Sequence, residues 1–125
     1  MRITIFDVVI DVVSLQHLPL VHALHALAEV ARVLKPGGEF FSIRLSEKCN
    51  NVGATNRIDE ATLFNIDDHT MPLANNRPTA FWSIALVNKL HEAAGIKVSS
   101  IEKVSRTYNS GMFVEYLAIT SILKM

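Results

Sequence analysis

Asp11 combines a side chain that can do chemistry with a position in the chain that favours function. It lies in the otherwise apolar stretch FDVVIDVV, which runs from Phe6 to Val13. A charged group inside such a stretch is costly to bury unless it has a partner. Open α/β sheets bind ligands outside the carboxyl ends of their strands, and Asp11 lies near such an end. Its position therefore favours a functional origin over chance.

Other clusters of titratable residues are weaker candidates. His22 and His25 are one helical turn apart, but no carboxylate or cysteine completes a ligand set, so we expect no metal site there. Asp67, Asp68 and His69 form the densest polar cluster of the polar segment between residues 46 and 79. A solvated loop face is the better interpretation of that cluster, because polar connections normally run over the surface.

The first elements that could position Asp11 form a strand, helix, strand unit. Ile3 to Val13 is rich in β-branched residues on both faces, which predicts an interior parallel strand covered on both sides. Leu20 to Leu34 has apolar residues at helical spacing. Pro36-Gly37-Gly38 then stops the helix and turns the chain into a second strand, Phe40 to Leu45. Two strands joined by a helix should be parallel.

The middle of the chain is polar and too long for a simple connection. We interpret residues 46–80 as an insertion or lid segment within a single domain of residues 1–125. A short helix is expected at Asp59 to Phe64. Phe81 to Ala94 predicts the second main helix, with Gly95 as its C-terminal cap. Trp82 and Phe81 at its start are expected to lie in the core rather than to bind substrate.

The last part of the chain predicts an antiparallel hairpin. Ile96 to Thr107 alternates apolar and polar residues with one slip, as a half-exposed strand near an edge does. Asn109-Ser110-Gly111 is turn chemistry, and Phe113 to Leu123 is rich in β-branched and aromatic residues. The fold class is therefore α/β, with two parallel strands, a crossover helix, a further helix and a C-terminal antiparallel hairpin.

Composition narrows the function classes. The 125 residues include 12 basic and 12 acidic side chains and no basic cluster, so nucleic acid is a poor partner. Acidic residues interrupt the longest apolar runs at Asp7, Asp11 and Glu115, so we expect no membrane span. The first residues do not form a basic region followed by an apolar stretch and a small-residue cleavage site, so we expect no secretion signal. The single cysteine, Cys49, is expected to be a free thiol in a reducing compartment, which makes the cytoplasm the expected location.

Three segments carry a resemblance to a known family. They are FDVV leading to His17-Leu18, the stretch EVARVLKPGG from Glu29 to Gly38, and LHEAAG at the end of the second helix. Together they resemble the C-terminal half of class I S-adenosylmethionine-dependent methyltransferases, in particular the type 11-like group that acts on small molecules. The resemblance implies a partial Rossmann-like sheet. The glycine-rich cofactor loop that opens the family's first half is not found in this sequence.

The resemblance also implies site residues. Asp11, Val12 and Val13 correspond to positions that touch the sulfonium end of S-adenosylmethionine. His17 corresponds to a frequent histidine on the substrate side and is a candidate catalytic base. Against this, a loop histidine more often forms a structural hydrogen bond near a helix start. With half of the cofactor site absent from the sequence, we expect this chain alone to bind S-adenosylmethionine poorly.

Three functional readings follow from the resemblance. The first is the C-terminal portion of a methyltransferase for a small-molecule acceptor, inactive or weak in isolation. The second is a catalytically silent dimerisation or regulatory module, and the third is a fragment left by gene truncation or an incomplete gene call. In the full family fold another strand pairs with strand 3–13 along its outer edge. Without it this strand is an open edge, so we expect a homodimer or a second chain to pair there.

Overall fold

A computed structural model describes residues 6–49, 56–64, 78–107 and 113–124. Their main sheet has the strand order β1-β2-β7-β6, and a smaller one has the order β3-β4-β5. The elements in chain order are β1 (Phe6–Val12), the 3₁₀ turn η1 (Leu15–His17), α1 (Leu20–Val33), β2 (Leu34–Leu45), β3 (Asn56–Arg57), β4 (Thr62–Phe64), β5 (Thr79–Ala80), α2 (Ile84–Ala93), β6 (Ile96–Thr107) and β7 (Phe113–Leu123).

The strand, helix, strand unit is confirmed. β1 and β2 are parallel, with Val9 beside Phe40 and Val12 beside Ile43. β2 is longer than expected, because the backbone of Leu34 already pairs with Phe6 before the turn is complete. The turn itself has the predicted chemistry, since Gly37 has φ 79°. A positive φ of this kind is accessible to glycine at little steric cost.

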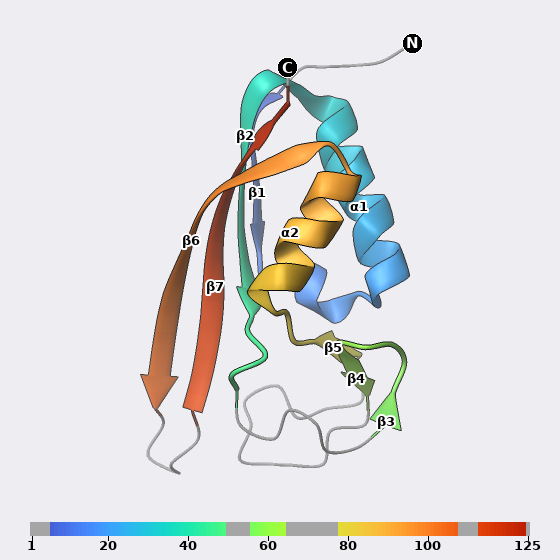
Figure 1. The fold of residues 1–125 in the computed structure, drawn as a ribbon, viewed down its shortest axis with the longest axis vertical. Coiled ribbons are helices and arrows are strands. Elements are labelled where there is room, and N and C mark those ends of the chain that lie inside the picture. Colours follow the sequence, from blue (N-terminus) through green and yellow to red (C-terminus); the bar gives the residue numbers. More distant parts are fainter. Residues whose placement is uncertain (1–5, 50–55, 65–77, 108–112, 125) are drawn as a thin grey trace.

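Both helices lie on one side of the main sheet (Figure 1), and the core lies between them and that side. α1 contacts the sheet through Ala23, Leu27 and Ala31, which are spaced by four residues and therefore share one helical face. The two alanines let the helix backbone approach the strands closely. Leu27 is fully buried, and its truncation to alanine would cost about 2–5 kcal/mol.

The second helix and the hairpin also agree with the sequence. Ser83 caps the N-terminus of α2 by accepting a hydrogen bond from Leu86 N at 3.0 Å. Gly95, with φ 83°, follows its C-terminus as predicted. β6 is an edge strand antiparallel to β7, while the expected turn at 109–111 lies outside the described residues. Phe81 and Trp82 are buried core residues, as expected.

Two expectations about secondary structure were wrong. Asp59 to Phe64 is a turn followed by β4, and not a helix, because the Asp59 carboxylate accepts hydrogen bonds from Ala61 N and Thr62 N. Those bonds close a local turn that competes with a helical start. The composition of strand 3–13 predicted an interior strand, but its described part, β1, lies at the edge of the sheet among the described residues, as the family resemblance led us to expect, with Ile10 65% exposed.

Candidate functional site

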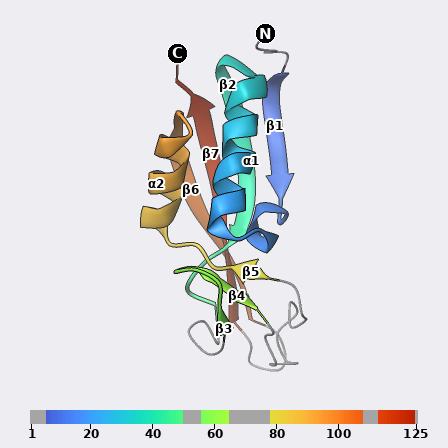
Figure 2. The same ribbon diagram turned by 90° about the vertical axis from the view of Figure 1, so that its right-hand side faces the viewer.

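β1 and β2 end at the same edge of the sheet, beside the small sheet and the N-terminus of α2 (Figure 2). At this edge Asp11 organises the backbone that leaves β1. Its Oδ1 accepts hydrogen bonds from the backbone N–H groups of Ser14 and Leu15, each at 3.2 Å. Its Oδ2 accepts one from Ser42 Oγ at 2.8 Å. The Asp11 carboxylate, which the sequence places in an apolar strand, therefore accepts three hydrogen bonds.

Val13 follows β1 in a conformation that its side chain disfavours. Its φ is 53°, the one positive value at a non-glycine position within the described residues. Left-handed backbone is a genuine outlier for a β-branched residue and costs about 1–3 kcal/mol. The hydrogen bond from Val13 N to Ile43 O, at 2.9 Å, and the Asp11 bonds hold it there. Backbone strain of this kind clusters at functional sites.

His17 ends the 3₁₀ turn η1, one loop away from Asp11. Its ring Nδ1 is buried and has no hydrogen-bond partner within the described part of the chain. The neighbouring Gln16 is fully buried, and its Oε1 accepts a hydrogen bond from Leu45 N at 3.0 Å. Gln16 therefore fixes η1 to the end of β2, and with it the backbone that carries His17.

A buried polar chain that sequence reasoning missed runs inward from Asp11. Ser42 Oγ accepts a hydrogen bond from Arg44 Nε at 2.9 Å, and Arg44 Nη2 lies 2.5 Å from His91 Nε2. His91 Nδ1 lies 2.9 Å from Ser121 Oγ. A signal was present: Arg44 shares its strand face with Phe40 and Ser42, inside a stretch predicted to be a core strand.

Burial and the neighbouring charges set the ionisation of this chain. Burial lowers the pKa of Arg44 to about 10, although the charge of Asp11 acts to raise it. Burial and the nearby Arg44 charge lower the pKa of His91 to about 3, so its ring is neutral at neutral pH. A neutral ring can accept from Arg44 at Nε2 and donate to Ser121 from Nδ1. The Arg44 guanidinium also lies 4.6 Å from the ring centroid of Trp82, within cation–π range.

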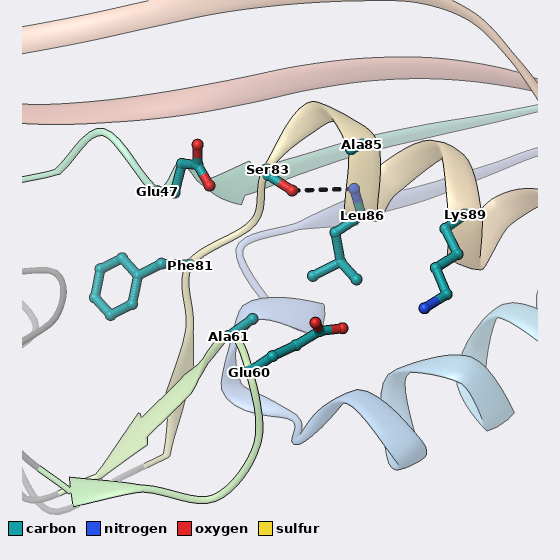
Figure 3. Close-up of a pocket in the computed structure, with 8 residues that line it drawn as sticks. All are labelled: Glu47, Glu60, Ala61, Phe81, Ser83, Ala85, Leu86 and Lys89. Atoms are coloured by element: carbon teal, nitrogen blue, oxygen red, sulfur yellow. Dashed lines mark hydrogen bonds between the residues drawn. The ribbon is translucent and has the colours of Figure 1, made fainter.

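A cavity of about 300 Å³ opens at the same end of the molecule, between α2 and the turn before β4 (Figure 3). Its walls combine two carboxylates and an ammonium group with apolar and aromatic surface. The lining residues are Glu47, Glu60, Ala61, Phe81, Ser83, Ala85, Leu86 and Lys89. A second cavity of about 250 Å³ shares Ser83 with the first and is lined by residues that include Trp82, Lys48 and Glu115.

The residues predicted from the sequence and the cavities are close in the fold but separate. Asp11, Val12, Val13 and His17 line neither cavity. The cluster Asp67, Asp68 and His69 lies outside the described residues. Within the described ranges, no group of three or more histidine, cysteine or acidic side chains could hold a metal ion. In those ranges there is also no helix with the length and apolar character needed to cross a bilayer.

A methyltransferase domain family model matches residues 3–42, which include β1, α1 and most of β2. The same architecture occurs in a solved S-adenosylmethionine-dependent methyltransferase from Methanosarcina mazei, which is 14% identical with a TM-score of 0.74. The chain has a methyltransferase fold. That alignment covers 100% of this chain and 63% of the Methanosarcina chain. None of the curated protein sequences matches this chain.

Two further structures delimit what the methyltransferase fold implies. The 1,6-didemethyltoxoflavin-N1-methyltransferase of Burkholderia thailandensis, solved with S-adenosylhomocysteine bound, is 19% identical with a TM-score of 0.66, over 96% of this chain and 44% of that one. The [4+2]-cyclase SpnF is 16% identical with the same TM-score, over 100% of this chain and 53% of that one. The chain thus spans between 44% and 63% of the length of these proteins. Because a cyclase shares the fold, the fold alone does not fix the reaction.

Proposed function

We propose that this chain is the C-terminal portion of an S-adenosylmethionine-dependent methyltransferase for a small-molecule acceptor, with weak or no activity as an isolated chain. The match to a methyltransferase domain and the fold support this. The observation that carries it is the left-handed backbone of Val13. This strained residue lies at the carboxyl end of β1, in the segment that the family resemblance assigns to the cofactor.

The residues near the carboxyl end of β1 have the charge and the apolar surface to bind the sulfonium end of S-adenosylmethionine. S-adenosylmethionine supplies an electrophilic methyl group on a positively charged sulfonium, and the Asp11 carboxylate offers the opposite charge nearby. Val12, whose side chain is 52% exposed, offers apolar surface. Asp11 is held by hydrogen bonds from Ser14, Leu15 and Ser42, so it would meet the cofactor without reorganising. This preorganisation lowers the cost of binding.

His17 would hold a proton of the acceptor. Its ring Nδ1 is buried and has no hydrogen-bond partner within the described residues, so this atom could accept a proton or a hydrogen bond if the turn opened to a ligand. Gln16 positions the turn that carries it. A base contributes to methyl transfer when the acceptor must lose a proton, whereas alignment and exclusion of water serve every acceptor. The cavity between α2 and the β4 turn is of the size of small-ligand pockets, but His17 does not line it, so the acceptor that His17 would serve is not assigned to that cavity.

A cofactor titration of the full chain tests the proposal. Calorimetry with S-adenosylmethionine should give measurable affinity, and two-dimensional NMR should shift the amide signals of Val12, Val13 and Ser14. Asp11→Asn should weaken binding, while the matched change Asp7→Asn should not, because Asp7 is an exposed residue that pairs with Lys35. If no signal near Val13 moves at saturating ligand, the chain has no cofactor surface and the proposal is wrong.

A second candidate function is a catalytically silent dimerisation or regulatory module with a methyltransferase fold. Its support is that β1 is an edge strand with exposed apolar side chains among the described residues. The two candidates give different results in the same titration. Absence of cofactor affinity together with a stable dimer supports the silent module.

We also infer that the chain works in a reducing compartment, with the cytoplasm as the proposed site. Cys49 is a free, buried thiol, and burial raises its pKa. A protonated, buried thiol is a poor nucleophile, so Cys49 should be structural. Fractionation of the native host with an antibody to the chain tests the compartment.

A further inference from the structure

Arg44 lies at the centre of the buried polar chain, and its side chain is fully buried. It follows Ser42 by two residues on β2 and therefore shares a strand face with it. Arg44 Nε donates to Ser42 Oγ at 2.9 Å, and Nη2 lies 2.5 Å from His91 Nε2. Apolar side chains of similar volume often stabilise a core as well as a buried charge does. Stability alone therefore does not account for an arginine at this position.

The side-chain types fix the direction of the hydrogen bonds between Arg44 and Asp11. A guanidinium only donates, and an ionised carboxylate only accepts. The Ser42 hydroxyl lies between them, so it accepts from Arg44 and gives its one hydrogen to Asp11 Oδ2 at 2.8 Å. Hydrogen bonds in such a series polarise and strengthen one another. Arg44 thus supports the bond from Ser42 to Asp11 without a hydrogen bond of its own to Asp11.

The Asp11 carboxylate connects this arrangement to the backbone that follows β1. Its other oxygen, Oδ1, accepts hydrogen bonds from Ser14 N and Leu15 N, each at 3.2 Å. These bonds close the turn that contains Val13, whose φ of 53° is unfavourable for a β-branched residue. A carboxylate that is held at Oδ2 has little freedom to turn Oδ1 away from the two amides. The bond from Ser42 therefore limits the movement of the strained turn.

We propose that Arg44 is a positioning residue for the turn after β1 and that it acts through Ser42 and Asp11. It holds the Asp11 carboxylate in the orientation that closes this turn. The consequence for binding rests on the proposed function, in which Asp11, Val12 and Val13 meet the cofactor. A surface that is ordered before the ligand arrives binds at a lower cost. Arg44 therefore prepares the cofactor surface from within the core.

Two buried serines provide a matched test by hydrogen exchange. Ser42 and Ser121 are both fully buried and both bond to the buried polar chain, but only Ser42 also bonds to Asp11. Ser42→Ala should speed exchange of the Ser14 and Leu15 amides about tenfold or more, the factor expected for one lost hydrogen bond to a charged group. Ser121→Ala should leave these two rates unchanged. Equal acceleration in the two natively folded variants, or none in either, would overturn the proposal.

A double-mutant cycle tests whether Arg44 acts through Ser42. Arg44→Met removes the charge and the donors but keeps an unbranched side chain, and it should speed exchange of the same two amides. In the Ser42→Ala background it should add nothing further, because the connection to Asp11 is already broken. Additive effects would show that Arg44 acts on stability alone and would overturn its assignment. Should Arg44→Met fail to fold, Arg44→Gln, which loses only the charge and keeps polar groups, replaces it with the same expected results.

Titration with S-adenosylmethionine gives the second readout. Ser42→Ala should raise the dissociation constant about tenfold, and Ser121→Ala should leave it unchanged. Equal weakening by the two variants would overturn the role of Arg44 in cofactor binding. Hydrogen exchange is measured without cofactor, so it judges the positioning of the turn by itself. Absence of cofactor binding by the unaltered chain would contradict the proposed function, whereas unchanged exchange rates in Ser42→Ala would contradict the positioning role.

Discussion

Arg44 and His91 meet in the core, with Nη2 of the guanidinium 2.5 Å from Nε2 of the imidazole. Arg44 comes from β2 and His91 from α2, and neither side chain has measurable exposure. The ring must be neutral to accept this hydrogen bond. The pair therefore connects the protonation of one histidine to the attachment of α2 to the sheet.

Acidification should weaken the fold through His91. Its pKa is about 3 in the folded chain, against about 6.5 when unfolded. Between these values the unfolded state binds more protons, so the free energy of unfolding falls as pH falls from about 6.5 toward 3, by up to about 1.4 kcal/mol per pH unit. His91→Gln can accept from Arg44 and donate to Ser121 without titrating. Urea unfolding at several pH values should show a shallower slope for this variant than for His22→Gln, an exposed control.

Asp59→Ala should destabilise the start of α1. The Asp59 carboxylate accepts a hydrogen bond from Leu20 N at 2.8 Å, across 39 positions of sequence, and so supplies the cap that Pro19 cannot. Loss of such a cap costs about 0.5–2 kcal/mol, and chemical unfolding would measure it. Asp7→Ala, which removes an exposed aspartate, should cost less. Equal losses from the two variants would contradict the capping role.

The pKa of the Asp59 carboxylate is the basis of a further prediction. Burial acts to raise the pKa of Asp59, but hydrogen bonds, led by that from Leu20 N, outweigh it and lower the pKa. A lowered folded pKa contributes stability above the unfolded value of about 3.9, and that stability is lost as pH falls through the folded value. NMR titration of the side-chain carboxyl should therefore give a midpoint below that of Asp59 in the urea-unfolded chain.

Val13→Gly should relieve backbone strain. A left-handed conformation costs a residue with a Cβ about 1–2 kcal/mol, and glycine escapes this cost. Val12→Gly, one position earlier in regular strand geometry, gains no such relief. We expect Val13→Gly to be the less destabilising of the two by about 1–2 kcal/mol in thermal unfolding. A larger loss at Val13 would mean that its side chain contacts outweigh the strain.

Gly38→Ala should disturb the contact between β1 and the turn before β2. An added Cβ would lie 2.8 Å from Lys35 O and 3.1 Å from Asp7 O, and both are backbone atoms that cannot move cheaply. Gly95→Ala is the matched control. Alanine would be strained at the φ of 83° that Gly95 adopts, but no atom lies within 4 Å of the added Cβ. Thermal unfolding should show a larger loss for Gly38→Ala than the roughly 1–2 kcal/mol expected at Gly95. Equal losses would show that the turn relaxes.

The sequence determined the elements whose signals are local. The helical spacing of Leu20 to Leu34, the stop at Pro36-Gly37-Gly38 and the alternation of Phe113 to Leu123 each depend on neighbours in the chain. The parallel pairing of β1 and β2 also followed, because a connecting helix leaves strands of this kind few other arrangements. Asp11 was recognisable as a candidate because its charge interrupts an apolar strand.

Tertiary structure decided the relations between residues that are distant in sequence. The chain from Asp11 through Ser42 and Arg44 to His91 exists because β1, β2 and α2 pack together, and no local pattern encodes the last contact. The cap on α1 comes from Asp59 for the same reason, which also explains why the expected helix there is a turn. Hydrogen bonds to buried charged groups contribute more to stability than local helix propensity does, so the packed fold overrides that propensity.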